Sequence, residues 1–257
     1  YDAWLVVTPA QHMRSVLAAA PPCGKPLILC AKGIEEGTGQ LLHHVARDAC
    51  PDADIAVLSG PTFAHEVAAG LPTAVTLAAE RADVAEALRA RIALPAFRIY
   101  VSDDVAGAEI GGAVKNVLAI ACGIVIGRAL GESARAALIS RGLAEMMRLG
   151  AALGARPETF MGLAGVGDLV LTATSAQSRN TGFGIALGQG RPLAELTGAG
   201  APLVEGFYTA RIAADLALNR KVEAPIIAAV AEILDGRLDV DAAMSTLLAR
   251  PLRREAG

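Results

Sequence analysis

The chain has 257 residues, of which 53% are hydrophobic and 4% aromatic, and its formal net charge at pH 7 is -3. A chain so rich in apolar residues can bury one large core or two of medium size, which excludes general disorder. The acidic balance, without runs of Lys or Arg, argues against a nucleic-acid groove or an anionic membrane surface as partner and leaves small neutral or anionic ligands open.

From residue 3 to about 101, short apolar runs alternate with amphipathic segments. The pattern predicts strands at 3–9, 25–33, 54–61, 73–79 and 97–102, with helices at 10–20, 38–50, 62–70 and 84–94 between them. Repeated β/α units of this kind build a mostly parallel sheet that is covered on both faces. Ligands of such sheets lie beyond the carboxyl ends of the strands, here at 8–9, 31–33 and 59–61.

From about residue 105 the sequence changes to long helical stretches rich in Ala, Leu, Gly and Met, with no convincing strand. We therefore predict an α/β part, residues 1–104, followed by an all-α part, residues 105–257, with a candidate ligand site in the cleft between them. The longest uninterrupted apolar stretch, 117–127, falls well short of the ~20 residues that cross a bilayer. It predicts a core helix.

Cysteine and histidine usage favours a reducing cytoplasm and no metal site. The four cysteines form no C-x-x-C and are Cys23, Cys30, Cys50 and Cys122. His43 and His44 are adjacent, so their side chains are expected to diverge on a helix, and no other histidine lies at a metal-ligand spacing from them. The chain also starts without an initiator Met and inside a strand pattern, which we interpret as a fragment of a longer protein.

Lys115 is the most conspicuous residue of the helical part. At 3.6 residues per turn it shares a helix face with Leu118, Ala119, Cys122 and Ile126. An ammonium on such a face needs a partner from elsewhere in the chain. Asp168 is the candidate, because it follows three glycines and begins an apolar run with Thr172 one turn on. The alternative, that Asp168 is the N-cap of the next helix, stays open.

Three other places carry groups that could contact a ligand. Lys32 follows an apolar strand, so its ammonium is expected in the crevice unless it is a solvated loop lysine. The stretch 59–66 is a strand edge where Gly60 permits close backbone approach and Pro61 can open a helix. A polar loop carries the triplet 178–180, whose guanidinium, hydroxyl and carboxamide suit a phosphate, although an exposed polar turn is the commoner explanation of such a triplet.

Six motifs together resemble the bacterial NAD(P)-dependent glycerol-3-phosphate dehydrogenase family. They are "AKGIEEGTG", "SGPTFAHEVAAGLPTAV", "IGGAVKNVLAIACG", "LISRGLAEMMRLGAALGA", "TFMGLAGVGDLVLTATSAQSRN" and "LVEGF", in this order, from about residue 3 to 250. The resemblance implies a partial Rossmann-like domain over residues 1–104, since the family's glycine-rich dinucleotide loop precedes the motifs seen here. It also implies a substrate and catalytic domain over residues 105–257.

The resemblance implies hydride transfer between NAD(P)H and dihydroxyacetone phosphate, giving sn-glycerol 3-phosphate for phospholipid synthesis in a cytoplasmic homodimer. Lys115 is then expected to be the general acid/base, Asp168 to orient it, and Lys32 to polarise the carbonyl and reach both ligands. The implied substrate contacts are Lys32, Gly60, Thr62, Lys115, Asn116, Asp168, Thr172, Ser178, Arg179 and Asn180. The implied cofactor contacts are Lys32, Ala64, Arg179, Leu203 and Glu205, with Leu203 standing where Val is expected.

Two other interpretations compete with this one. The 3-hydroxyacid and 6-phosphogluconate type dehydrogenases also use a helix-borne lysine, but with an asparagine four residues on, where this chain has Ala119. A truncated, non-catalytic relative that keeps the helical part as a dimeric module is the second alternative. The complete set of Lys32, Lys115, Asp168 and Arg179 argues against it.

Overall fold

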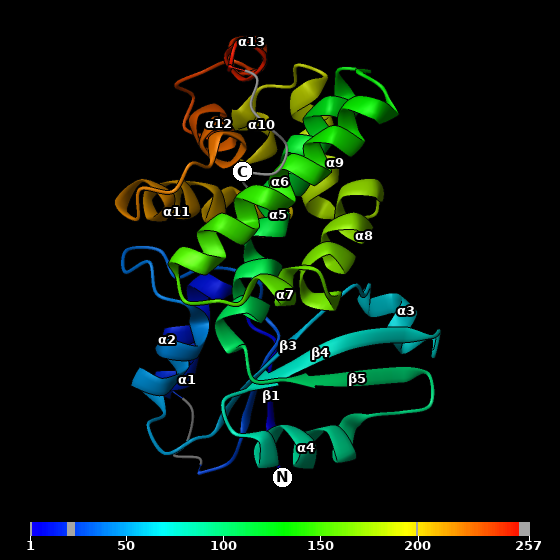
Figure 1. Ribbon diagram of the computed structural model, residues 1–257, viewed down its shortest axis with the longest axis vertical. Helices are drawn as coiled ribbons and strands as arrows, with labels where there is room; N and C mark the ends of the chain where they lie inside the picture. The colour runs from blue at the N-terminus through cyan, green and yellow to red at the C-terminus, as the bar shows by residue number, and fades with distance from the viewer. Residues whose placement is uncertain (1, 20–23, 199, 252–257) are drawn as a thin grey trace.

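The computed structural model describes residues 2–19, 24–198 and 200–251, with a strand-rich first part and a helical second part (Figure 1). One five-stranded sheet has the order β1-β2-β3-β4-β5. The strands are β1 (Trp4–Val6), β2 (Leu27–Leu29), β3 (Ile55–Ser59), β4 (Thr73–Ala79) and β5 (Phe97–Ser102). Each of the five expected strands is present, and the α/β class with a helical C-terminal part is confirmed. Cys23 lies outside the described residues.

Alternate residues of each strand point to opposite faces of the sheet, and each face packs against its own apolar cluster. Leu27 and Leu29 pack with the core formed by the 3-10 turn η1 (Ala10–His12), α1 (Met13–Ala19) and α2 (Leu42–Ala49). Ile28, between them, packs on the other side with residues of α4 (Ala82–Ile92). Helices α1, α2 and α4 therefore cover the sheet, as a β/α arrangement requires.

One of the expected repeated β/α units is wrong. Strand β4 pairs antiparallel with β3, whereas the other neighbouring pairs are parallel. The connection between them holds only α3 (Ala64–Ala68), which has no buried residue. A return to the same end of the sheet needs a crossover that packs on a sheet face. Because α3 packs on neither face, the chain turns back and β4 runs the opposite way.

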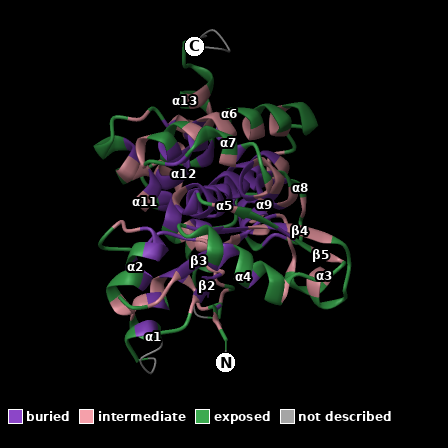
Figure 2. Ribbon diagram, turned by 60° about the horizontal axis from the view of Figure 1, so that its bottom comes forward, coloured by how far each residue is buried: buried purple, intermediate pink, exposed green. Residues whose placement is uncertain are grey.

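Helix α5 (Val105–Gly127) is the axis of the helical part, and Figure 2 shows it as the buried centre of the molecule. Asp104 caps its first turn by accepting a hydrogen bond from Gly107 N at 2.9 Å. Among the described residues α5 is the helix with the length and composition to cross a membrane, but 89% of its most apolar window is buried by the rest of the chain. The predicted core helix is thus confirmed and is longer than the apolar stretch 117–127.

Further helices follow α5 in the second part of the chain. They are α6 (Glu132–Ala152), α7 (Pro157–Phe160), the π-helix η2 (Leu163–Gly167), α8 (Asp168–Thr174), α9 (Arg179–Gly188), α10 (Leu193–Leu196), α11 (Glu205–Asn219), α12 (Pro225–Leu234) and α13 (Val240–Leu248). Helices α6, α8, α9, α11 and α12 all contact α5 directly. Most of one continuous apolar core therefore surrounds the helix that carries Lys115.

The adjacent histidines do not diverge as expected, since the ring centroids of His43 and His44 are 3.9 Å apart. A buried acid on α5 holds one of them. Glu109 accepts from His43 N at 2.8 Å through Oε1, and its Oε2 lies 2.6 Å from His43 Nδ1. This carboxylate occupies the N-terminus of α2, where the N-cap residue Leu41 offers no side-chain cap.

Candidate active site

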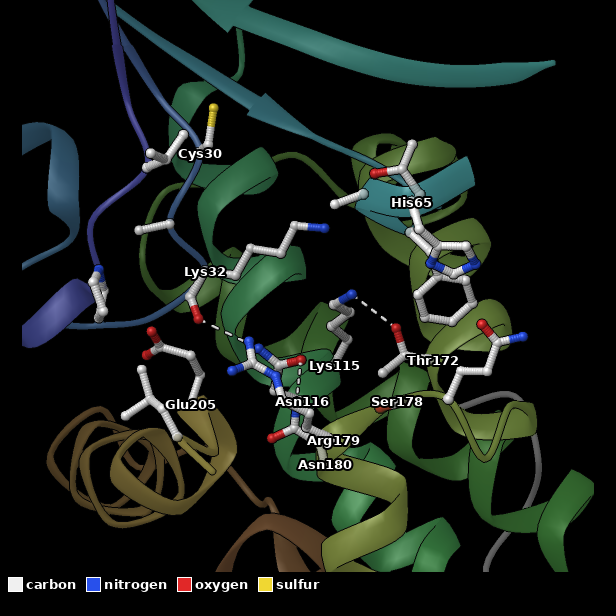
Figure 3. A pocket seen from close by; sticks show the side chains of 18 of the residues that line it. Cys30, Lys32, His65, Lys115, Asn116, Thr172, Ser178, Arg179, Asn180 and Glu205 are labelled. Carbon is white, nitrogen blue, oxygen red and sulfur yellow. Dashed lines mark hydrogen bonds between the residues drawn. The ribbon is translucent and has the colours of Figure 1, made fainter. Parts of the chain in front are cut away.

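A cavity of about 640 Å³ lies where the carboxyl ends of β1 and β2 meet the helical part (Figure 3). Its volume is typical of a small-ligand pocket. The lining residues are Val7, Thr8, Pro9, Cys30, Ala31, Lys32, Thr62, Phe63, Ala64, His65, Lys115, Asn116, Thr172, Gln177, Ser178, Arg179, Asn180, Leu203 and Glu205. The sheet edge that the sequence predicted therefore contributes one wall, through the chain that follows β1, β2 and β3.

Lys115 meets its partner at the floor of this cavity. The Lys115 ammonium donates to Asp168 Oδ1 and, at 2.7 Å, to Thr172 Oγ1. The Lys115 and Asp168 side chains are 7% and 0% exposed, so this is a buried ion pair. Breaking such a pair by removing one partner leaves an uncompensated buried charge. The structure thus confirms Asp168 as the partner that the sequence predicted for Lys115.

Lys32 shares the same carboxylate. Its Nζ lies 2.6 Å from Asp168 Oδ2 and also donates to Gly60 O at 3.2 Å. The two ammoniums therefore bind opposite oxygens of one buried acid, and Figure 3 shows both reaching into the same space. Two lysines and one carboxylate carry a net positive charge when all three are ionised. The floor of the cavity is thus suited to an anionic ligand.

This arrangement changes the proton affinity of one amine. Burial, followed by the charge of Lys32, lowers the pKa of Lys115 to about 7, and Asp168 opposes that change by favouring the ammonium. An amine in water is almost entirely protonated at neutral pH. Lys115 can instead exchange a proton near neutrality, as a general acid or base must.

The backbone around Asp168 explains its placement. The π-helix η2 runs directly into α8, so Asp168 is the first residue of α8, and the N-cap residue Gly167 makes no side-chain cap. The N-cap interpretation of Asp168 is wrong, because its two oxygens accept from lysines. Single π-helical turns are frequent at functional sites, where they redirect side chains.

A relay of two amides ties the helices to the sheet edge. Asn116 Nδ2 donates to Lys32 O at 3.3 Å, and Asn180 Nδ2 donates to Asn116 Oδ1 at 2.9 Å. Asn180 Oδ1 in turn accepts from Gly206 N at 2.9 Å. The backbone donor and acceptor at the two ends fix the orientation of both amides. Both side chains are committed to holding backbone, which the sequence did not predict.

The triplet 178–180 begins a helix and is not the polar loop that the sequence suggested. Ser178 is the N-cap of α9, since its hydroxyl accepts from Thr181 N at 3.3 Å. Ser178 and Asn180 are buried, while Arg179 is exposed and lines the cavity. Within the described chain the Arg179 guanidinium has no hydrogen bond or ion pair, so its donors are open to a ligand.

The remaining predicted residues divide between wall and support. Thr62, Ala64, Leu203 and Glu205 line the cavity. Gly60 lies behind the wall: a Cβ there would be 2.9 Å from Val75 Cα, so the close approach that requires glycine is to β4. Pro61 does not open a helix directly, because α3 begins at Ala64.

Four cavity residues carry hydrogen-bonding or aromatic groups to which the sequence gave no role: Thr8, Phe63, His65 and Gln177. Phe63 and His65 stack with centroids 5.9 Å apart. Thr8 Oγ1 and Glu205 Oε2 are buried and have no hydrogen-bond partner among the residues described. Thr8 had a signal in the sequence as part of the strand end at 8–9, and Phe63 and His65 lie in the stretch 59–66, but neither pattern assigned these side chains a contact.

Comparison with known proteins places two family models on this chain. The NAD-dependent glycerol-3-phosphate dehydrogenase N-terminus matches residues 1–85, and the C-terminus of the same family matches residues 104–245.

Individual relatives agree with these models. A glycerol-3-phosphate dehydrogenase [NAD(P)+] of Erythrobacter litoralis is 60% identical over 98% of this chain and 76% of its own length. One from Parvibaculum lavamentivorans is 56% identical over 99% and 77%. The crystal structure of glycerol-3-phosphate dehydrogenase from Coxiella burnetii superposes with a TM-score of 0.91 at 42% identity, covering 97% of this chain and 77% of that one. The chain thus spans about three quarters of the length of such relatives.

Proposed function

The chain belongs to the NAD-dependent glycerol-3-phosphate dehydrogenase family, and we propose how its residues interconvert dihydroxyacetone phosphate and sn-glycerol 3-phosphate with NAD(P)H. The observation that carries this proposal is the buried carboxylate of Asp168 between the ammoniums of Lys32 and Lys115. Such a group can hold an anionic triose and deliver a proton in one place.

The residues at the sheet end of the cavity fit the nicotinamide cofactor. Thr8 Oγ1 and Glu205 Oε2 are buried hydrogen-bonding atoms without a partner in the described chain, and a carboxamide or hydroxyl would satisfy both. When bound, NAD(P)H supplies the hydride. The residues proposed to hold it are Lys32, Ala64, Arg179, Leu203 and Glu205.

Lys115 is the proposed general acid. In the reduction its ammonium gives a proton to the substrate C2 oxygen as negative charge develops there, and in the oxidation the neutral amine takes that proton back. A pKa of about 7 makes both forms available at neutral pH. Asp168 and Thr172 hold the amine by accepting two of its hydrogens, so the third can point at the substrate.

Lys32 is the proposed second cation at the reacting centre. Its ammonium is anchored by Asp168 Oδ2 and Gly60 O, and its backbone carbonyl is held by Asn116. A fixed positive charge beside the carbonyl stabilises the oxygen as charge accumulates on it. Because both anchors are already in place, Lys32 needs little reorganisation during the reaction.

Arg179 is the proposed phosphate ligand. Its guanidinium is open to the cavity, and a forked donor binds phosphate oxygens through paired charge-assisted hydrogen bonds. It is also the first residue of α9, where free N–H groups favour an anion. Ser178, Asn180, Asn116 and Thr62 line the cavity and complete the proposed substrate contacts, the two amides through the N–H groups that the relay leaves unused. Gly60 lies behind the wall and is proposed to act through its carbonyl, which holds Lys32.

We further propose that residues 1–104 carry the dinucleotide-binding part, that residues 105–257 carry the substrate and catalytic part, and that the chain acts as a cytoplasmic homodimer in phospholipid synthesis. The free thiols of Cys30 and Cys122 support a reducing compartment. Sedimentation of the purified protein tests the dimer: a single species of twice the chain mass is expected, and a monomer at all concentrations contradicts it.

The activity test is direct. The chain is mixed with NADH or NADPH and dihydroxyacetone phosphate, and consumption of the reduced cofactor is followed with unphosphorylated dihydroxyacetone as control. The expected result is turnover with a much lower KM for the phosphorylated ketone. A chain that binds glycerol 3-phosphate or dimerises without turnover favours the non-catalytic module. Equal KM values for the two ketones contradict the phosphate site.

A further inference from the structure

Two glycines of α5, Gly111 and Gly112, lie one helical turn before Lys115 and Asn116. Residues four apart on a helix lie on the same face, so these glycines face the neighbourhood of the catalytic amine. Glycine is less favourable than alanine inside a helix. Two in succession in the N-terminal half of α5, where every neighbouring residue is buried, therefore require a packing reason, and each has a different one.

Gly111 lets the segment that leads to Asp168 approach α5. A Cβ at position 111 would lie 2.3 Å from the carbonyl oxygen of Ala164 and 3.1 Å from its carbon. Ala164 belongs to η2, which runs without a break into Asp168. Because the clash is with backbone, a side chain at 111 cannot be accommodated by a rotamer change. It would push η2, and Asp168 with it, away from Lys115.

Gly112 makes room for the stem of Lys32. A Cβ at position 112 would lie 3.0 Å from Ser59 Oγ, 3.3 Å from Lys32 Cγ and 3.6 Å from Lys32 Cδ. The Lys32 side chain thus crosses α5 over this glycine on its way to Asp168. Ser59 Oγ is buried beside Gly112 and has no hydrogen-bond partner in the described chain. Its closeness to position 112 therefore limits the size of the residue there without adding a hydrogen bond. A larger residue at 112 would displace the Lys32 ammonium.

We propose that Gly111 and Gly112 are positioning residues that set the two ammonium–carboxylate distances around Asp168. Gly111 sets the separation of Asp168 from Lys115, and Gly112 sets the position of Lys32 beside both. This inference rests on the proposed role of Lys115 as the proton donor. In this proposal, the close approaches that Gly111 and Gly112 permit help to set the proton affinity of the Lys115 amine.

Substitutions at the two glycines are expected to shift the pKa of Lys115 in opposite directions. Asp168 favours the ammonium of Lys115 and Lys32 disfavours it. Moving Asp168 away by substitution at 111 therefore lowers the pKa of Lys115. Moving Lys32 away by substitution at 112 raises it. A general loss of packing would not separate the two variants in this way.

The test measures the Lys115 amine directly. The parent chain, Gly111→Ala and Gly112→Val are trace-labelled with acetic anhydride across a pH series, and the Lys115 peptide is quantified by mass spectrometry against the exposed Lys221. At an effective dielectric of about 20, a 1 Å displacement between charges about 4 Å apart shifts the labelling midpoint by about half a pH unit. The expected midpoint falls in Gly111→Ala and rises in Gly112→Val.

Gly127→Ala is the matched control. It lies on the same helix, and its Cβ would also meet a backbone oxygen at 2.3 Å, that of Ile185 on α9, but it is more than three turns beyond Lys115. We expect it to lower the melting temperature without moving the midpoint. Shifts of both test variants in the same direction, or a shift in Gly127→Ala as large as theirs, overturn the proposal.

If Gly111→Ala does not fold, Gly112→Val decides alone: a higher midpoint supports the proposal, and an unchanged or lower one overturns it. Turnover is not part of this readout. A chain without dehydrogenase activity that shows the two opposite shifts would contradict the proposed function and support the positioning role.

Discussion

Replacing Asp168 by Asn removes the charge that both lysines share and is the sharpest perturbation of the site. Asn keeps the size of the side chain and one acceptor oxygen, so the change is mainly electrostatic. Two unit charges about 4 Å apart at an effective dielectric of about 20 interact by about 4 kcal/mol, equivalent to about three pH units. The Lys115 amine should therefore lose its proton well below the pKa of about 7 that it has beside Asp168.

The consequence is a loss of the acid form at neutral pH. With the titration lowered by about three pH units, the protonated fraction of Lys115 near pH 7 falls by about 10³, and the rate of dihydroxyacetone phosphate reduction falls with it. Asp168→Asn should also lower stability by less than the 3–5 kcal/mol typical of a broken buried pair, because the amine can neutralise itself.

The assay is the initial rate of dihydroxyacetone phosphate reduction across a pH series, with Asp103→Asn as control. Asp103 also pairs with a cation, Arg156, but its side chain is 66% exposed, so its removal should change rate and stability little. The reduction rate of Asp168→Asn should partly recover on acidification. A rate within tenfold of the parent with an unchanged pH profile would refute the shared-carboxylate argument.

Three further results are expected. The rate of reduction should fall, and that of glycerol 3-phosphate oxidation rise, as pH increases through about 7, because the first needs the ammonium of Lys115 and the second its neutral amine; parallel profiles in the two directions would contradict this. Arg179→Ala should raise the KM for dihydroxyacetone phosphate by about 10- to 100-fold and change kcat only a few-fold, while the KM for dihydroxyacetone stays the same. Steady-state kinetics that show a loss confined to kcat would argue against phosphate binding by Arg179. Burial raises the pKa of Glu145 from 4.5 to about 7, so this carboxyl ionises at lower pH in the unfolded chain and the stability of the fold falls as pH rises between these values. Glu145→Gln should remove this loss and raise the free energy of unfolding above pH 7, measured in denaturant, by up to about 3 kcal/mol. Destabilisation above pH 7 would mean that the hydrogen bonds from Ile226 N and Ile227 N to the carboxylate outweigh its desolvation.

The sequence predicted the features that depend on local pattern. The five strands are visible as short apolar runs, and the buried helix as an apolar stretch. The isolated Lys115, two residues before that stretch, indicated a buried partner, and Asp168 is in contact with it. These predictions hold because hydrophobic periodicity and the cost of an unpaired buried charge are properties of the residues themselves.

The features that depend on packing between distant segments were not predicted. The direction of β4 follows from the failure of α3 to cover the sheet, which its sequence does not reveal. The sharing of Asp168 by Lys32 depends on where the end of β2 meets α8. The amide relay depends on where the middle of α5 meets the first turns of α9 and α11. Ser178 was assigned to a loop because its capping bond to Thr181 N is visible only in the folded chain.

Lys115→Met tests most directly the claim that Lys115 delivers the proton to the substrate. Methionine retains most of the side-chain volume on the apolar helix face and removes the amine that carries the proton. The measurement is the single-turnover rate of dihydroxyacetone phosphate reduction with the cofactor bound. The account predicts a rate lower by about 10²- to 10⁴-fold, with glycerol 3-phosphate still bound through Arg179. A rate within tenfold of the parent would mean that another group delivers the proton.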